Sequence, residues 1–152
     1  MKKSSIAVFI IIFASFYVSS ILFPIDKEWY DALNKPSWTP SGQTIGMIWT
    51  VLFTLIALSA TLIYNQYGFK PISFWILFVV NYVLNQAFSY FQFAQKDLLL
   101  ATFDAFLIAV TTLLLVIYAS RLRKVSGWLL IPYLLWSSFA TYLSWTIYNM
   151  NA

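Results

Sequence analysis

Apolar residues along this chain form five long runs, and short polar joints separate the last four. The runs cover about residues 5–23, 43–65, 71–93, 98–120 and 127–148. Each is close to the ~20 residues that a helix needs to cross a bilayer. None alternates like a barrel strand, and short joints force neighbouring helices to run antiparallel. The pattern predicts an all-α integral membrane protein, a five-helix transmembrane bundle that forms a single domain over residues 1–152.

The first run follows Lys2 and Lys3, and a secretory signal peptide has the same arrangement. The run is longer than the apolar region of a signal peptide, and its bulky residues offer no small-x-small cleavage site. We therefore expect a retained first helix.

The connection between the first two runs, about residues 24–42, has an unusual composition. The stretch Trp29–Trp49 holds three of the seven tryptophans, two of the five prolines and two of the four glycines. It is too apolar for a solvated linker, and its prolines and glycines oppose a helix. Long loops with structure of their own are typically lids or binding loops. We predict a capping lid, in which the principal residues are Trp29, Lys35, Pro36 and Trp38.

Composition and charge support the membrane assignment and suggest an orientation. Only 9% of the residues are charged, against ~25% in soluble domains. Six basic residues lie at the N-terminus and the second and fourth joints, and three lie on the opposite side. This bias predicts a cytoplasmic N-terminus, with the lid and the C-terminus external. Because the basic residues flank apolar runs, we expect no nucleic-acid partner.

Cysteine and histidine are both absent. This excludes disulfides, thiolate chemistry, zinc sites and haem ligation by either residue. No metal site is predicted.

Polar residues share one face of two of the predicted helices. They are Asn81, Asn85, Ser89 and Gln92 in the third run and Ser137, Thr141, Ser144 and Tyr148 in the fifth. Such faces must turn inward. Asn81, Ser137, Thr141 and Ser144 are interpreted as structural residues that form hydrogen bonds between helices. For Asn85 and Gln92, a structural role and a place in a pocket both stay open.

Asp104 is the one carboxylate inside a predicted span, and such a group is a functional-site hypothesis by default. Its expected partners are Lys35, the indole N–H of Trp38 or backbone amides. Anchoring the lid is the favoured role, and direct ligand contact is the alternative.

Four of the tryptophans divide into two groups by their positions in the predicted helices. Trp75 and Trp128 stand near the ends of runs, as interfacial belt residues do. Trp49 and Trp136 fall inside helices, where each indole N–H needs a partner. With Phe53 and Phe88 they would form walls for a flat aromatic ligand, and their N–H groups could donate to its carbonyl or carboxylate.

Small residues recur at helical spacing in two places. Gly42 and Gly46 favour close packing beneath the lid. The alanines Ala101, Ala105 and Ala109 offer a weak candidate for a helix interface between copies of the chain.

Several of these residues together resemble a known signature. They are Trp29-Tyr30, Leu33-Asn34-Lys35-Pro36-Ser37-Trp38-Thr39-Pro40, Gly46, Trp49, Leu84-Asn85, Asp104, Pro132-Tyr133-Leu134-Leu135-Trp136 and Phe139-Ala140. The chain resembles the TspO/MBR family, the tryptophan-rich sensory proteins that include the mitochondrial translocator protein, or peripheral-type benzodiazepine receptor. The resemblance covers nearly the whole chain and is closest to a bacterial, Bacillus-type member.

The resemblance implies a five-helix bundle, usually a homodimer, in the bacterial cell membrane. It also implies a pocket that binds protoporphyrin IX, related tetrapyrroles, and isoquinoline carboxamide and benzodiazepine drugs. The implied pocket residues are Tyr30, Pro40, Ile45, Trp49, Phe53, Asn85, Phe88, Asp104, Trp136, Ala140, Leu143 and Ser144. In the family, two tryptophans hold the ligand's polar atom, and Trp49 and Trp136 match them.

The family includes members that degrade protoporphyrin IX in light, and whether this chain is an enzyme stays open. No catalytic residue is certain; Trp49 and Trp136 are candidates for photochemistry. Protoporphyrin IX would be ligand or substrate, and no covalently bound cofactor is expected. The chain departs from the family at Gln86, Phe88 and Ser144, and it lacks the basic residue of the cholesterol-binding pattern. A membrane receptor or sensor is the favoured function; a porphyrin transporter and a structural or interaction protein are the alternatives.

Overall fold

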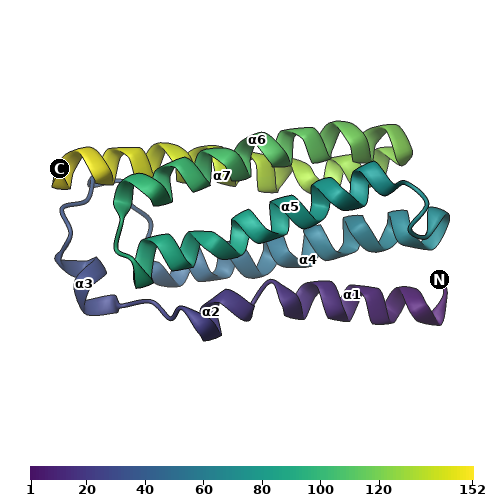
Figure 1. Ribbon diagram of the computed structural model, residues 1–152, viewed down its shortest axis with the longest axis horizontal. Coiled ribbons are helices and arrows are strands. Elements are labelled where there is room, and N and C mark those ends of the chain that lie inside the picture. The colour runs from purple at the N-terminus through teal and green to yellow at the C-terminus, as the bar shows by residue number, and fades with distance from the viewer.

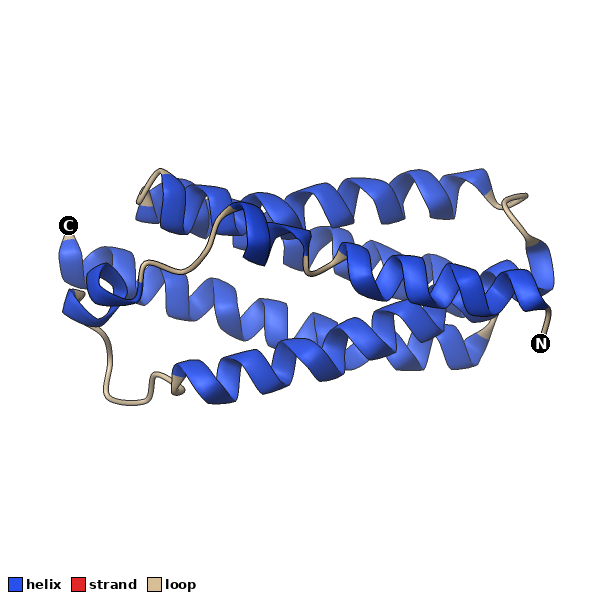
Figure 2. Ribbon diagram, turned by 90° about the horizontal axis from the view of Figure 1, so that it is seen from below, coloured by secondary structure: helices blue, strands red, loops and turns tan.

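The computed structural model describes residues 1–152, and every regular element in it is a helix (Figures 1 and 2). The elements are α1 (Lys3–Ser15), α2 (Val18–Leu22), α3 (Lys27–Ala32), α4 (Gly42–Tyr67), α5 (Ile72–Ser89), the π-helix η1 (Tyr90–Ala94), α6 (Leu98–Leu122) and α7 (Lys124–Asn151). The long helices lie side by side in one elongated bundle, with the N-terminus at one end and the C-terminus and α3 at the other (Figure 1).

The helices pack in a ring. In order around the ring lie α1 with α2, then α4, α7, α6 and α5, which returns to α2. The closest pair is α6 and α7, which are joined by Arg123 alone. Consequently the joints α4–α5 and α6–α7 share the end of the N-terminus, and the joint α5–α6 shares the end of α3 and the C-terminus (Figure 1).

A helix is present at each predicted apolar run. Four stretches are long and apolar enough to cross a membrane: Lys3–Leu22, Gly42–Tyr67, Ile72–Ala94 and Leu98–Leu122. The fifth helix, α7, has 28 residues but is not among them, because serine, threonine, tyrosine, tryptophan and asparagine recur through it. The all-helical membrane bundle is confirmed, and a fifth crossing by α7 stays a prediction.

The first helix is interrupted, which the sequence did not predict. Helix α1 ends at Ser15 and α2 begins at Val18, with a turn at residues 16–17 between them. Side chains of α5 bond the backbone groups that the break leaves free. The Gln86 amide accepts from the Ser19 N–H at 2.8 Å and donates to the Phe16 carbonyl at 3.0 Å. The Tyr82 hydroxyl donates to the Ser15 carbonyl at 2.9 Å. Unpaired backbone groups are costly in an apolar medium, so α5 makes the break tolerable.

The connection between α2 and α4 is partly helical. Asp26 caps α3 by accepting from the Trp29 N–H at 3.1 Å, so the expectation of a fully non-helical segment is wrong for residues 27–32. The non-helical part contains Pro36 and Pro40, which disfavour the interior of a helix. Ser41 caps α4 by accepting from the Thr44 N–H. We call residues 24–41 the connecting segment.

Two separate polar tethers help to fix the connecting segment to the bundle. At one, the Lys96 ammonium lies 2.9 Å from the Asp26 carboxylate and 5.6 Å from the centroid of the Trp29 ring. At the other, the Asn34 N–H donates to the Asn151 side chain at 2.9 Å, and the Asn151 amide donates back to the Asn34 carbonyl at 2.8 Å. Lys96 has a φ of 55°, a left-handed conformation that is costly for a side-chain-bearing residue.

Three expectations about packing require correction. Trp75 is a core residue, 9% exposed, whose indole donates to the Gly68 carbonyl at 3.0 Å, and it does not belong to a surface belt. Trp128, at 74% exposed, does lie on the surface. Gly42 and Gly46 have open space around them, because no atom lies within 4 Å of where a Cβ would stand. Ala101 and Ala105 are buried inside the chain and cannot form an interface between copies.

Replacing Gln86 tests the role assigned to it at the helix break. Gln86→Leu leaves the Ser19 N–H and the Phe16 carbonyl unpaired. We expect the free energy of unfolding in detergent to fall by about 1–3 kcal/mol, the cost of unsatisfied buried groups. Gln66→Leu is the matched control, since the Gln66 amide donates only to the neighbouring Tyr67 hydroxyl. Equal stability of the two variants would contradict the assignment.

The tether at Asp26 has a defined pH dependence. The hydrogen bond from Lys96, and next the one from the Trp29 N–H, lower the pKa of Asp26 below its ordinary 3.8. The carboxylate therefore stays ionised, and the tether intact, as the pH falls from 7 to about 4; it is lost only as the pH falls through the lowered pKa. Lys96→Gln removes the ion pair at any pH. We expect faster hydrogen exchange at the amides of α3, while Lys27→Gln, an exposed lysine of the same segment, leaves exchange unchanged. Equal hydrogen exchange in the two variants would show that the Lys96–Asp26 ion pair does not stabilise α3.

Candidate functional site

Four aromatic rings meet between α4 and α7, where the sequence predicts a pocket. The Trp49 ring lies 5.4 Å from Phe53, 6.3 Å from Tyr133 and 6.4 Å from Trp136, measured between centroids. The two indoles are perpendicular, with an interplanar angle of 90°. We call these four residues the aromatic cluster. Trp49 and Trp136 both point into the bundle, as expected from their positions within helices, and their rings are in mutual contact.

A network of buried amides and hydroxyls borders the aromatic cluster. The Tyr133 hydroxyl donates to the Asn81 side chain at 2.9 Å and accepts from the Asn85 amide at 3.2 Å. Asn81 also donates to the hydroxyls of Thr111 and Thr112 on α6, at 2.8 and 3.1 Å. The network ties α5, α6 and α7 together. Asn81 is structural, as predicted, and Asn85 holds one wall of the cluster in place through Tyr133.

Two polar groups next to this network have no partner. Asp104 is 4% exposed, and neither of its carboxylate oxygens accepts a hydrogen bond. The indole N–H of Trp136 is buried and donates to nothing. One group is an acceptor and the other a donor, and buried groups of either kind are normally paired. A third unpaired group, the Thr61 hydroxyl, lies toward the other end of α4.

The partners that the sequence suggested for Asp104 are engaged elsewhere. The Lys35 ammonium donates to backbone carbonyls of its own segment, at Tyr30, Asp31 and Leu33. Trp38 is 43% exposed and stacks on Tyr142, with ring centroids 5.5 Å apart. The expectation that Asp104 anchors the connecting segment is therefore wrong. Lys35 stabilises the segment from within, and Trp38 fixes it to α7.

Tyr30 of the connecting segment packs against the bundle at η1. Its ring lies edge-on to Phe93 of η1 at 6.3 Å, and the Lys35 ammonium lies 4.7 Å from its centroid. Burial, and to a lesser extent the Asp31 carboxylate, raises the pKa of the Tyr30 phenol above its ordinary 10.0. Tyr30 is therefore a neutral hydrogen-bonding group at physiological pH.

The remaining predicted pocket residues are less tightly connected to the cluster. Phe88 packs against the apolar core, and Leu143 is buried. The others, all partly exposed, are Pro40, Ile45, Ala140 and Ser144. One expectation about α7 is wrong: the hydroxyls of Ser137 and Thr141 bond to carbonyls of their own helix, at Leu134 and Ser137, and not across to another helix.

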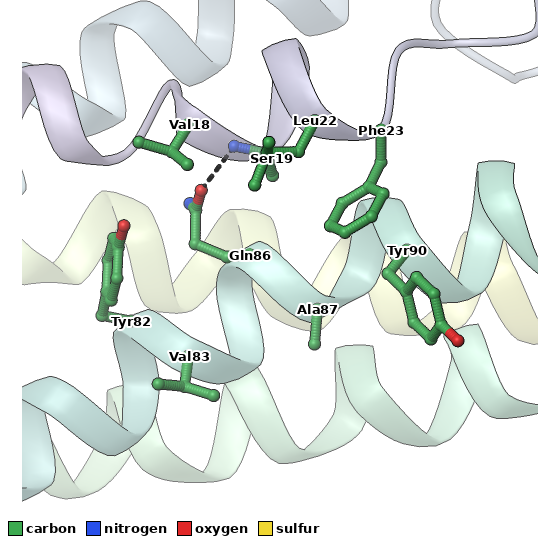
Figure 3. Close-up of a pocket in the computed structure, with 9 residues that line it drawn as sticks. All are labelled: Val18, Ser19, Leu22, Phe23, Tyr82, Val83, Gln86, Ala87 and Tyr90. Carbon is green, nitrogen blue, oxygen red and sulfur yellow. Dashed lines mark hydrogen bonds between the residues drawn. The ribbon is translucent and has the colours of Figure 1, made fainter.

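A groove that the sequence did not predict lies between α2 and α5 (Figure 3). It has a volume of about 440 Å³ and is lined mainly by apolar side chains. Gln86 reaches across its floor to the Ser19 N–H, and the rings of Phe23 and Tyr90 stand at its far end (Figure 3). None of the predicted pocket residues lines it. The groove exists because α2 is offset from α1 by the break, for which the sequence contains neither proline nor glycine as a signal.

Comparison with known proteins shows which family the chain resembles. The model of the TspO/MBR family matches residues 6–149. The chain is 70% identical to the tryptophan-rich protein TspO of Bacillus cereus, over 99% of both chains. It is 53% identical to the uncharacterized membrane protein YtaB of Bacillus subtilis, again over 99% of both. Identity to the human translocator protein is 25%, over 82% of this chain and 75% of the human one.

The family match and the apolar helices together identify the class of this protein. The matched region includes the connecting segment, the aromatic cluster and Asp104. The helices long enough to cross a bilayer place the protein in the membrane. This chain is an integral membrane protein and belongs to the TspO/MBR family.

Proposed function

We propose that this protein is a membrane receptor or sensor that binds tetrapyrroles, with protoporphyrin IX as the representative ligand, at the aromatic cluster. Isoquinoline carboxamide and benzodiazepine-type drugs would use the same site. The proposed site comprises the twelve residues that the family resemblance implies, capped by the connecting segment. Relatives of this chain bear the names tryptophan-rich sensory protein and translocator protein, which agree with a role in handling small molecules.

The observation that carries the proposal is the pair of unpaired groups, Asp104 and the Trp136 N–H. Leaving a buried donor or acceptor unpaired costs ~1–3 kcal/mol. A ligand that brings both a donor and an acceptor would remove both costs on binding. Protoporphyrin IX has this character, since a protonated propionic acid group donates through its O–H and accepts at its carbonyl oxygen. A purely apolar ligand would leave both groups unpaired.

The aromatic cluster suits the rest of such a ligand. Flat rings bind well between aromatic side chains. Because the rings of Trp49 and Trp136 touch each other, a porphyrin could enter only if they part. The connecting segment lies at this end of the bundle and is held by side-chain tethers. We infer that binding requires both the segment and the two indoles to move.

Light-dependent breakdown of protoporphyrin IX by dioxygen is a second candidate activity. A continuous series of rings leads from the cluster toward the surface: Trp136 lies 5.3 Å from Phe139, which lies 5.8 Å from the exposed Trp38. Electron-rich indoles near an excited porphyrin could quench it or trap reactive oxygen species. Such chemistry would belong mainly to the ligand.

The two alternative functions predict different experimental results. A porphyrin transporter predicts flux into liposomes, and a structural or interaction role predicts that cluster mutations change no binding. We further propose a homodimer and a cytoplasmic N-terminus, the latter because six of the nine basic residues lie at that end.

The indole donors can be tested by conservative replacement. Trp49→Phe and Trp136→Phe keep an aromatic ring but remove the N–H. We expect each to weaken saturable binding of protoporphyrin IX in the dark by about 5- to 100-fold, because the ligand's buried acceptor would lose its partner. Trp145→Phe, which replaces an exposed indole on α7, is the control. The same samples under illumination would show protein-dependent porphyrin loss if the second activity is present. Identical binding by all variants and by empty micelles would end the porphyrin assignment.

Asp104 allows a ligand role to be separated from a structural one. Asp104→Leu replaces an unpaired buried carboxyl with an apolar group of similar size. We expect the free energy of unfolding without ligand to rise by about 1–3 kcal/mol, because an unsatisfied group is removed. Affinity for protoporphyrin IX should fall in the same variant. A loss of stability would show that the carboxyl stabilises the fold, and unchanged affinity would show that it does not contact the ligand.

A further inference from the structure

The end of the bundle that carries the N-terminus is basic, with no carboxylate to offset it. Its charged side chains are Lys2, Lys3, Lys70, Arg121, Arg123 and Lys124. Four of the five acidic residues lie at the opposite end and the fifth, Asp104, lies within α6. The one ion pair of the structure, Lys96 with Asp26, is also at the opposite end. Six cationic groups therefore lack a partner within the chain.

A small cavity opens at this basic end, at the joint of α6 and α7. It has a volume of about 220 Å³, and its lining residues are Ser120, Lys124, Gly127, Trp128 and Ile131. The lining is mixed: a hydroxyl and an ammonium lie toward the end of the bundle, and an indole and an aliphatic chain lie farther along α7. Since a water molecule occupies ~30 Å³, the cavity has room for a phosphate group with part of a glycerol.

The walls of this cavity are held in place before any ligand arrives. Ser59 and Ser126 exchange hydrogen bonds between side chain and carbonyl at 2.8 and 3.1 Å. The Tyr67 hydroxyl donates to the Leu122 carbonyl at 2.9 Å. A Cβ at Gly127 would lie 1.8 Å from the Ser120 hydroxyl, so only glycine allows α6 and α7 to approach this closely. The site is rigid because α4 supports both helices that form it.

The surface beside the cavity suits a lipid and not a soluble anion. Trp128 is 74% exposed, as an indole at the level of lipid headgroups is. Beyond it, Leu135 of α7 and Ile117 of α6 are exposed apolar side chains. A headgroup in the cavity would leave its acyl chains on this apolar surface. Basic pockets between membrane helices bind anionic headgroups in this way.

We propose that the cavity at the α6–α7 joint binds the phosphate headgroup of an anionic phospholipid. Lys124 provides the charge, Ser120 a hydroxyl donor, and Trp128 packs against the glycerol region. Arg121 and Arg123 add to the local positive potential from the same joint. The site lies at the other end of the bundle from the connecting segment, and it does not depend on the ligand proposed above.

The test is lipid binding to the full chain, measured by native mass spectrometry from detergent. The probes are phosphatidylglycerol and phosphatidylcholine with identical acyl chains. We expect wild type to retain phosphatidylglycerol in preference to phosphatidylcholine. Lys124→Ala should weaken phosphatidylglycerol binding about fivefold, the effect of one basic residue near anionic lipid, and leave phosphatidylcholine unchanged. Trp128→Ala should weaken it as well. Both residues are exposed, so neither change removes core packing.

Lys70→Ala is the matched control, because it removes the same charge at the same end from a residue that does not line the cavity. We expect it to change phosphatidylglycerol binding less than twofold. Equal losses in Lys70→Ala and Lys124→Ala would overturn the site in favour of diffuse charge attraction. Equal retention of the two lipids by wild type would overturn it too. Displacement of the lipid by glycerol phosphate at equal concentration would assign the cavity to a soluble phosphate.

Discussion

The absence of water around the bundle is the constraint on which the rest of this structure depends. In hydrocarbon each backbone or side-chain polar group must find its partner inside the protein. Gln86 and Tyr82 meet this demand at the break in the first helix, and Asn81, Asn85 and Tyr133 meet it between α5, α6 and α7. Against this background, the unpaired groups of Asp104 and Trp136 are conspicuous. The need to pair each buried polar group thus explains both what stabilises the fold and where the candidate binding site lies.

The parts of the fold that the sequence predicts are those that depend on local pattern. Apolar runs locate the long helices to within a few residues, and the spacing of Asn81 and Asn85 places both side chains inward, where they are buried. The inward direction of Trp49 and Trp136 follows from the same reasoning. Each of these features is determined by residues within one helix, so helical periodicity is sufficient to find it.

The features that sequence reasoning missed depend on contacts between distant segments. The break after Ser15 has no proline or glycine to mark it, and it is stabilised by Gln86, which lies in a different helix. Lys35 and Asp104 have opposite charges and were expected to pair, yet Lys35 bonds to nearby carbonyls. Trp75 resembles a belt residue by its position near a helix end, but the Gly68 carbonyl draws it into the core. In each case a competing partner, invisible in the local pattern, determines the geometry.

The double attachment of the connecting segment has a kinetic consequence. Asp26 is tied to the α5–α6 joint and Asn34 to the end of α7. The segment therefore binds the bundle at two points, as a bivalent ligand binds its receptor. When one attachment breaks, the other keeps the freed group at a high effective concentration near its partner, and rebinding is fast. Full release requires both attachments, and the ring contacts of Tyr30 and Trp38, to be open at the same moment. The attached segment therefore persists longer than either attachment alone would allow, although each attachment can be weak.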